Sequence, residues 1–293
     1  MKLVTFTHQG VTRIGKVVDR QVLDLSRALP SLPRTMRELL ALGPSALDAV
    51  RHAAAAHDSL LPLDGVALEA PVPDPRKFLA IGMNYRDHIE ESARKGIRAP
   101  ETQIWFNKQV SCVHGPYAAV HRPRLSAMLD YEVELCVVIG QRCRLVSEAD
   151  ALSVVAGYTI ANDFSVRDVQ WASPTWTLGK SFDTHGPIGP WLVTADEVPD
   201  PQSLRLRLTV NGELRQDNST ALMLYGVRQQ IAHLSRIMTL EPGDLLATGT
   251  PMGVGAGREP PVYLKAGDVV RAEITGLGHL ENRVIDEPVD GRP

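Results

Sequence analysis

The sequence predicts an α+β protein that is mostly β, with a small N-terminal α+β domain ahead of a larger one. Two observations carry this prediction. After residue 75 the chain is dominated by short β-branched runs and has few stretches of helical spacing. The first 70 residues instead combine short strand-like runs with an Ala-rich helical stretch, and a proline-punctuated link follows from Pro62 to Pro75. We therefore expect one domain over residues 1–70 and a larger domain over residues 75–288.

Turn residues and periodicity predict the individual elements in chain order. Residues 3–25 predict two or three strands with turns at Gly10, Gly15 and Asp19, and the spacing in residues 35–60 predicts a helix. Asn211-Gly212 lies between two apolar runs and predicts a tight hairpin. In the larger domain we expect helices over 84–96, 147–156 and 222–238, and strands within 131–140, 157–166, 204–214 and 268–278.

Composition and charge exclude several classes of function. The 293 residues are 44% hydrophobic and 22% charged, as in a soluble globular protein. A net charge of -3 gives no reason to expect a nucleic-acid or anionic-membrane partner. The N-terminus lacks a signal-peptide pattern, and no apolar run approaches the roughly 18 residues that span a bilayer. Three cysteines without CxxC spacing fit reduced thiols, so we expect a cytoplasmic protein without a cysteine zinc site.

The most informative segment is the acidic run from Leu129 to Leu135. Alternation along a strand places Asp130, Glu132 and Glu134 on one face, whereas Tyr131, Val133, Leu135 and Val137 face a core. Two carboxylates about 5 Å apart repel by roughly 3 kcal/mol at an effective dielectric near 20, so the acids need protons, basic partners or a cation. A solvated face with salt bridges is one interpretation, and a metal site is the other.

A further acid favours the metal interpretation. Asp163 ends the apolar run Gly157–Asn162, and a strand end is a common place for a ligand. Carboxylate oxygens prefer hard cations such as Mg²⁺, Mn²⁺ or Ca²⁺ to zinc.

Three other stretches carry residues suited to acid–base chemistry or anion binding. His88 and Glu91 are three apart on a predicted helix, where they form either a general-base pair or an ordinary surface pair. Lys180 lies in a loop bracketed by glycines and prolines, and is either a surface lysine or a group that binds a carboxylate or enolate oxygen. The glycine-rich stretch 247–255, with the hydroxyl of Thr250, can hold an anionic group. We assign no role to His114, His121 and His185.

Six segments, in order, resemble the fumarylacetoacetate hydrolase family. They are NYRDHIEE, the Phe106-Asn107-Lys108 segment, DYEVELCVVIG, GYTIANDFSVRDVQ, GKSFDTHGPIGPW and GDLLATGTPMGVG, and they cover about residues 75–285. The resemblance implies a mixed β-sandwich roll, commonly a homodimer, and a small N-terminal domain of a kind found in many members.

The resemblance also implies roles for particular residues. Glu132, Glu134 and Asp163 would ligate Mg²⁺ or Mn²⁺, and Asp130 would support them without binding the ion. His88 and Glu91 would form a water-activating pair on a segment that acts as a lid. Lys180, Gln170 and Thr250 match positions that contact the substrate. Five residues near these motifs are candidates for the far end of the substrate: Tyr85, Arg86, Arg167, Trp171 and Trp176.

The family's substrates share a 2-oxo acid or 1,3-dicarbonyl unit, so we expect a small-molecule 2-oxo acid as the partner. The leading hypothesis is a metal-dependent hydrolase that cleaves a C–C bond in an acylpyruvate or related β-diketo acid, because the His88–Glu91 pair is retained. The alternatives are a decarboxylase or isomerase of oxaloacetate or 2-hydroxyhepta-2,4-diene-1,7-dioate-like diacids, and a ureidoglycolate lyase. A binding protein without catalysis is the reading from another class.

Overall fold

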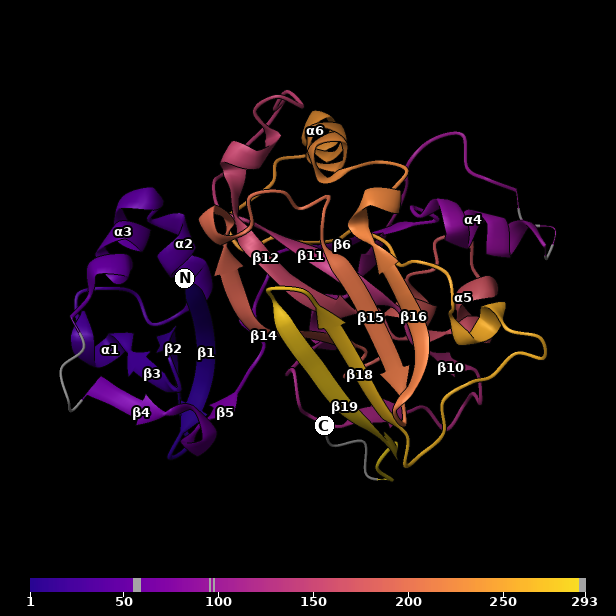
Figure 1. Cartoon of the computed structure of the whole chain (residues 1–293), viewed down its shortest axis with the longest axis horizontal. Helices are drawn as coiled ribbons and strands as arrows, with labels where there is room; N and C mark the ends of the chain where they lie inside the picture. The colour runs from indigo at the N-terminus through magenta and orange to yellow at the C-terminus, as the bar shows by residue number, and fades with distance from the viewer. Residues whose placement is uncertain (55–58, 95, 97, 290–293) are drawn as a thin grey trace.

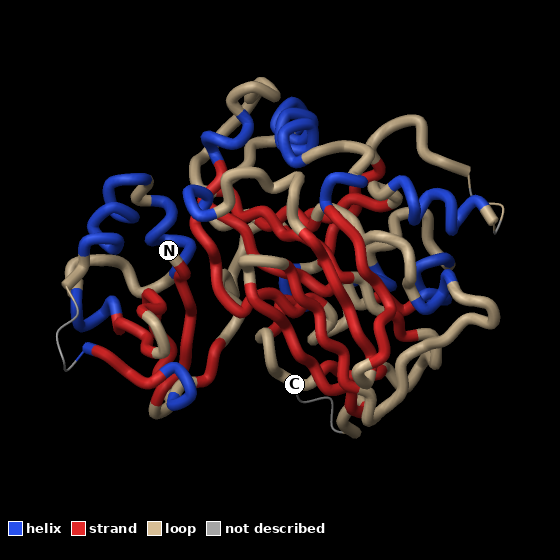
Figure 2. Tube along the Cα trace, viewed as in Figure 1, coloured by secondary structure: helices blue, strands red, loops and turns tan. Residues whose placement is uncertain are grey.

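The computed structural model describes residues 1–54, 59–94, 96 and 98–289 (Figure 1). Strands predominate over helices, which confirms the mostly β prediction (Figure 2). Within the described residues the strands form sheets of twelve, five and two members. No helix among these residues is long and apolar enough to cross a membrane.

The N-terminal part begins with an antiparallel meander. Turns lie at Gly10 and Asp19 as the sequence predicts, but the turn expected at Gly15 is wrong, because Gly15 lies inside the second strand and pairs with residues on both neighbouring strands. The meander contains β1 (Lys2–His8), β2 (Val11–Val18), β3 (Gln21–Asp24) and β4 (Leu60–Pro62). Gly10 and Asp19 adopt the positive φ values, 73° and 52°, that these tight turns require.

The single helix expected over residues 35–60 is wrong in detail. Gly43, with φ of 78°, ends one helix, and Pro44 begins the next. The resulting helices are α2 (Met36–Ala41) and α3 (Pro44–His52), preceded by the short α1 (Leu25–Ala28). The part of the prediction that falls on residues 55–58 lies outside the described residues.

The largest sheet runs without interruption from the N-terminal part into the larger part. Its order is β4-β3-β2-β1-β14-β12-β11-β17-β6-β7. The junction is the antiparallel pairing of β1 with β14, in which Lys2 is opposite Val193 and Leu3 is opposite Leu192. Because the sheet is shared, the boundaries 1–70 and 75–288 stay a prediction. The remaining members of the path are β14 (Gly186–Thr194), β12 (Val155–Asn162), β11 (Val133–Ile139), β17 (Leu245–Ala247), β6 (Phe78–Gly82) and β7 (Ile104–Lys108).

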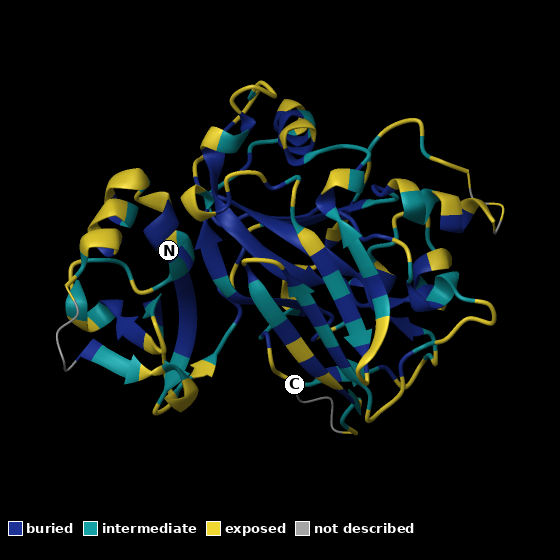
Figure 3. Ribbon diagram, in the orientation of Figure 1, coloured by how far each residue is buried: buried dark blue, intermediate teal, exposed yellow. Residues whose placement is uncertain are grey.

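A second sheet packs over β11 and β12 and closes the core. Its order is β16-β15-β18-β19-β9, and Asn211-Gly212 forms the predicted hairpin turn between β15 and β16. Leu135 and Val137 of β11 are buried in one apolar cluster with Leu206 and Val270 of this sheet. Figure 3 shows the largest sheet mostly buried, whereas strands of the second sheet alternate between buried and more exposed residues. The members are β9 (Val120–Arg122), β15 (Arg205–Val210), β16 (Glu213–Ser219), β18 (Val269–Ile274) and β19 (Gly278–Asp286).

Helices are few in the larger part, and the one expected over 147–156 is wrong. A 3₁₀ turn covers Ala151–Val154, and β12 begins at Val155 because it pairs with β11 along most of its length. The expected helices over 84–96 and 222–238 are present as α4 (Arg86–Ala93) and α6 (Val227–Ile237). Near the site lie α5 (Arg167–Trp171) and the two-stranded sheet of β10 (Leu129–Asp130) with β13 (Ser165–Val166).

Candidate active site

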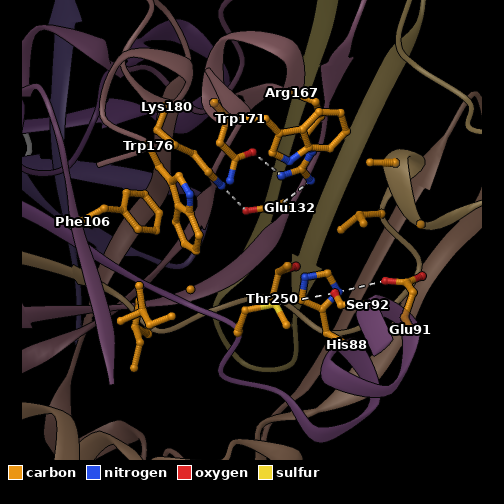
Figure 4. A pocket seen from close by; sticks show the side chains of 18 of the residues that line it. His88, Glu91, Ser92, Phe106, Glu132, Arg167, Trp171, Trp176, Lys180 and Thr250 are labelled. Carbon is orange, nitrogen blue, oxygen red and sulfur yellow. Dashed lines mark hydrogen bonds and ion pairs between the residues drawn. The ribbon is translucent and has the colours of Figure 1, made fainter. Parts of the chain in front are cut away.

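A cavity of about 220 Å³ lies between α4, α5 and the ends of β6, β7 and β11 (Figure 4). Most of the predicted site residues line it: His88, Glu91, Glu132, Glu134, Gln170, Lys180 and Thr250. Asp163 is buried directly behind Lys180. Arg86 is exposed and is not among the lining residues, although the sequence placed it in the substrate site.

The three predicted metal ligands form one cluster. Glu132, Glu134 and Asp163 are all buried, and one carboxylate oxygen of each lies within 4.8 Å of those of the other two. Antiparallel pairing of β11 with β12 brings them together, because Glu134 is opposite Ala161 and the amide of Asp163 donates to the carbonyl of Glu132 at 2.8 Å. Residues about thirty positions apart in the chain therefore meet at one end of two neighbouring strands.

The acidic strand differs from the regular strand that alternation predicts. β10 ends at Asp130 and β11 begins at Val133, so Glu132 lies in the break between these two strands. The odd-numbered residues face the core as expected: Tyr131, Val133, Leu135 and Val137. Since all the acids are buried, the solvated-face interpretation is wrong.

Asp130 turns away from the other acids and binds different partners. Its carboxylate accepts hydrogen bonds from the amides of Gly255 and Ala256 at 2.7 and 2.9 Å, and from Arg167 Nε at 2.9 Å. The guanidinium of Arg167 also lies 2.7 Å from Glu132. Asp130 therefore connects the glycine-rich loop to Arg167, whose guanidinium contacts the candidate metal ligand Glu132.

Two lysines are buried among the ligand carboxylates. Lys180 Nζ lies 2.6 Å from Glu132 and 2.7 Å from Asp163, and Lys108 Nζ lies 2.6 Å from the other oxygen of Asp163. Sequence reasoning missed the role of Lys108. Its only signal was its place in the Phe106-Asn107-Lys108 segment, since residue spacing does not show a contact with a residue 55 positions away.

The electrostatics of this cluster are those of a cation site. Burial favours the neutral form of Glu132, but Lys180 and Arg167 lower its pKa to about 2. Burial raises the pKa of Glu134 well above its ordinary value, and the charges of Asp163 and Glu132 add to the effect. Among the described residues Glu134 forms no ion pair, and its carboxylate accepts a hydrogen bond from the amide of Gly249 at 2.8 Å. A hard divalent cation would stabilise the ionised form of Glu134 beside the other two carboxylates, so these residues fit Mg²⁺ or Mn²⁺.

The predicted histidine–carboxylate pair is formed on α4. His88 Nδ1 lies 2.8 Å from Glu91 Oε2, and Glu91 Oε1 accepts a hydrogen bond of 3.0 Å from the amide of Gly253. When Nδ1 donates to this carboxylate, Nε2 of the neutral imidazole is left as a proton acceptor. Figure 4 shows this pair on the opposite side of the cavity from Lys180 and Glu132.

The rest of the cavity wall consists of apolar side chains and of polar groups that already hydrogen-bond to other protein atoms. Thr250 donates to the carbonyl of Val133 at 2.9 Å and accepts from Gln216 at 2.8 Å, whereas Gln170 accepts from Arg167 at 2.9 Å. The apolar lining includes Ile81, Ile104, Phe106, Trp171 and Trp176. Arg98 also lines the cavity and forms no ion pair with the described residues; no sequence motif singled it out.

Comparisons with known proteins agree with this fold. The family profile described as "Fumarylacetoacetate (FAA) hydrolase C-terminal" matches residues 77–285. The mitochondrial oxaloacetate tautomerase fahd2 of Xenopus laevis is 44% identical over 97% of this chain and 90% of its own length. A fumarylacetoacetate hydrolase from psychrophilic Exiguobacterium antarcticum is 39% identical, covers 98% of this chain and 100% of its own, and has a TM-score of 0.85. Maleylpyruvate hydrolase from Sphingobium sp. SYK-6, in complex with manganese(II) and pyruvate, is 33% identical with a TM-score of 0.78 at the same coverage.

Proposed function

Because this chain belongs to the fumarylacetoacetate hydrolase family, we propose that it is a Mg²⁺- or Mn²⁺-dependent enzyme that interconverts the enol and keto forms of a 2-oxo diacid. Oxaloacetate is the substrate to test first, since the Xenopus relative is named for its tautomerisation. The comparisons therefore favour the isomerase alternative over the C–C hydrolase that the sequence led with. The observation that carries the proposal is a proton acceptor, His88, across one small cavity from the cation Lys180.

The chain's own residues supply most of the chemistry of such a reaction. A divalent cation bound by Glu132, Glu134 and Asp163 would stabilise negative charge on the oxygens of the 2-oxo acid. His88 Nε2 removes a proton from the carbon next to the ketone and can return it, while Glu91 holds the imidazole in the required tautomer. Lys180 offers an ammonium group to the oxygen that becomes negative.

Hydrolysis of a C–C bond is the second candidate. The maleylpyruvate hydrolase has the same fold, and the same His88–Glu91 pair could remove a proton from water. Hydrolysis requires a water molecule next to the substrate carbonyl, whereas tautomerisation requires none. The same residues of the site could therefore serve both reactions, and the products distinguish them.

The test is a substrate panel with purified enzyme and added Mg²⁺ or Mn²⁺. We expect faster loss of enol absorbance from oxaloacetate, no carbon dioxide, no cleavage of acylpyruvates or maleylpyruvate, and no urea from ureidoglycolate. EDTA should abolish the activity and Mn²⁺ should restore it. Cleavage of a β-diketo acid with an unchanged rate of enol loss would instead establish the hydrolase.

For assembly we propose a homodimer, as the family resemblance implies. For location we propose the cytoplasm from the cysteine pattern, whereas the Xenopus relative is described as mitochondrial. Sedimentation of the purified protein and cell fractionation test these two statements.

A further inference from the structure

Helix α4 carries the His88–Glu91 pair, yet it packs on the protein mainly through polar groups. Its buried residues are Glu91 and Ser92. Its only large apolar side chain, Ile89, is only partly buried. A helix usually docks by burying an apolar stripe, so α4 must be held in another way.

Two carboxylates on one face of α4 provide that attachment. Asp87 and Glu91 are four positions apart, and they accept hydrogen bonds from the successive amides of Met252 and Gly253 at 3.2 and 3.0 Å. Asp87 Oδ2 also accepts a 2.5 Å hydrogen bond from Nδ2 of Asn218 on β16. Asp87 therefore joins α4 to both the glycine-rich loop and the second sheet.

The two ends of the helix are held unequally. Before its first turn, Asn84 is anchored by the amides of Leu224 and Tyr225 and by the carbonyl of Thr248, at 2.7 to 2.9 Å. Beyond Asp87, the attachment of the helix rests mainly on Glu91, which must also hold His88. The contact of Asp87 with Asn218 holds the helix between Asn84 and Glu91. Glu91 then bears less of the attachment, and its carboxylate can orient the imidazole of His88.

We propose that Asp87 and Asn218 are positioning residues that fix α4, and with it His88, over the cavity. The inference rests on the proposed role of His88 as the proton acceptor. Asp87 and Asn218 do not line the cavity, so they act through the helix and not on the substrate. Loss of their hydrogen bond should loosen the helix and slow proton transfer without weakening the metal site.

The experiment compares Asn218→Asp, Asn218→Leu and the exchanged pair Asp87→Asn/Asn218→Asp with the wild type. Asn218→Asp places two carboxylates in contact, and Asn218→Leu removes the donor at similar volume. The exchanged pair restores one donor and one acceptor between the two side chains, although the amide of Met252 then loses the oxygen that accepts from it. Asp217→Asn is the matched control, because Asp217 is the neighbouring residue of β16 and pairs with Arg205 at the surface.

The first readout is hydrogen exchange of the peptide covering α4, in Mn²⁺ with oxalate, and it requires no turnover. We expect about tenfold faster exchange in Asn218→Asp, a smaller change in Asn218→Leu, and none in Asp217→Asn, as for loss of one hydrogen bond to a charged group. The exchanged pair should recover part of the change. Unaltered exchange in both single variants, or an equal change in the control, would overturn the proposal.

The second readout is kinetic and separates positioning from general damage. We expect kcat to fall about tenfold in Asn218→Asp while the dissociation constant of Mn²⁺ stays within about twofold of wild type. Equal losses in kcat and in Mn²⁺ affinity would overturn the proposal. If exchange responds as expected but the wild type does not tautomerise oxaloacetate, the proposed function fails and the attachment of α4 stands.

Discussion

The ammonium nitrogen of Lys180 lies 2.7 Å from Oδ2 of Asp163, a residue that we assign to the metal. The same nitrogen lies 2.6 Å from Glu132, so Lys180 forms ion pairs with two of the three candidate ligands. A divalent cation and this ammonium group therefore compete for the same oxygens, and protein stability should depend on both.

Replacing Lys180 with Met should destabilise the protein most when no divalent ion is added. Breaking a buried ion pair leaves an uncompensated charge and costs about 3–5 kcal/mol, whereas a bound dication replaces that charge. We expect urea unfolding to show a loss of this order in EDTA and a clearly smaller loss in Mn²⁺. Lys77→Met, which breaks the pair with buried Asp244 away from the site, should cost the same in both conditions. Equal losses for Lys180→Met with and without Mn²⁺ would contradict the assignment.

His88→Gln should abolish turnover without loss of metal binding. Removing a positioned proton acceptor typically lowers the rate by about 10²–10⁴-fold, and Glu91→Gln should have a smaller effect of the same kind because the imidazole loses its orienting carboxylate. Calorimetry with Mn²⁺ should give wild-type affinity for both variants. A variant that keeps full activity would remove His88 from the mechanism.

Arg98→Met should raise KM for a diacid but not for a monoacid. Arg98 lines the cavity and forms no ion pair with the described residues, so it is a cation available to the second carboxylate of oxaloacetate. We expect KM for enol-oxaloacetate to rise about two- to fivefold, as for an exposed ion pair, and KM for enol-phenylpyruvate to stay constant or fall. Arg94→Met, an exposed arginine at the end of α4, is the control. A parallel rise for both substrates would rule out this recognition.

His185 should make stability depend on pH below neutrality. Complete burial lowers its pKa to about 3, and Nε2 donates to the carbonyl of His121 at 2.8 Å. Below pH 6.5 the unfolded chain binds a proton that the folded protein excludes, so stability falls as pH decreases from 6.5 toward 3, by up to about 1.4 kcal/mol per unit. His185→Gln keeps a donor and cannot titrate. Its unfolding free energy should change less between pH 7.5 and 5.5 than that of wild type; equal slopes would refute the prediction.

Much of the candidate site could be predicted because its residues cluster within short motifs. The alternation around Val133 correctly separated core residues from acids, and Asp163 was recognised as the end of an apolar strand. Alternation failed at Glu132, because a break between two strands leaves no local pattern. The alternation pattern nevertheless identified Glu132 and Glu134 as neighbours. Both a continuous strand and a break before β11 place these two acids at the same end of β11.

The features that could not be predicted depend on contacts between distant segments. Lys108 on β7 contacts Asp163, which follows β12, and Arg98 reaches the cavity without belonging to any motif. Val155 starts a strand where a helix was expected, since pairing with β11 decides a short stretch that local preference leaves open.

The pairing of β1 with β14 has a consequence for truncated forms of the chain. Without residues 1–70, β14 would present unpaired peptide groups at Leu192 and Val193, and the apolar cluster that contains Ile188 would lose Leu3. An uncovered strand of this kind recruits strands from other molecules. We therefore expect a chain that lacks residues 1–70 to precipitate on expression. In the full chain, β1 covers the edge of β14 and prevents this association.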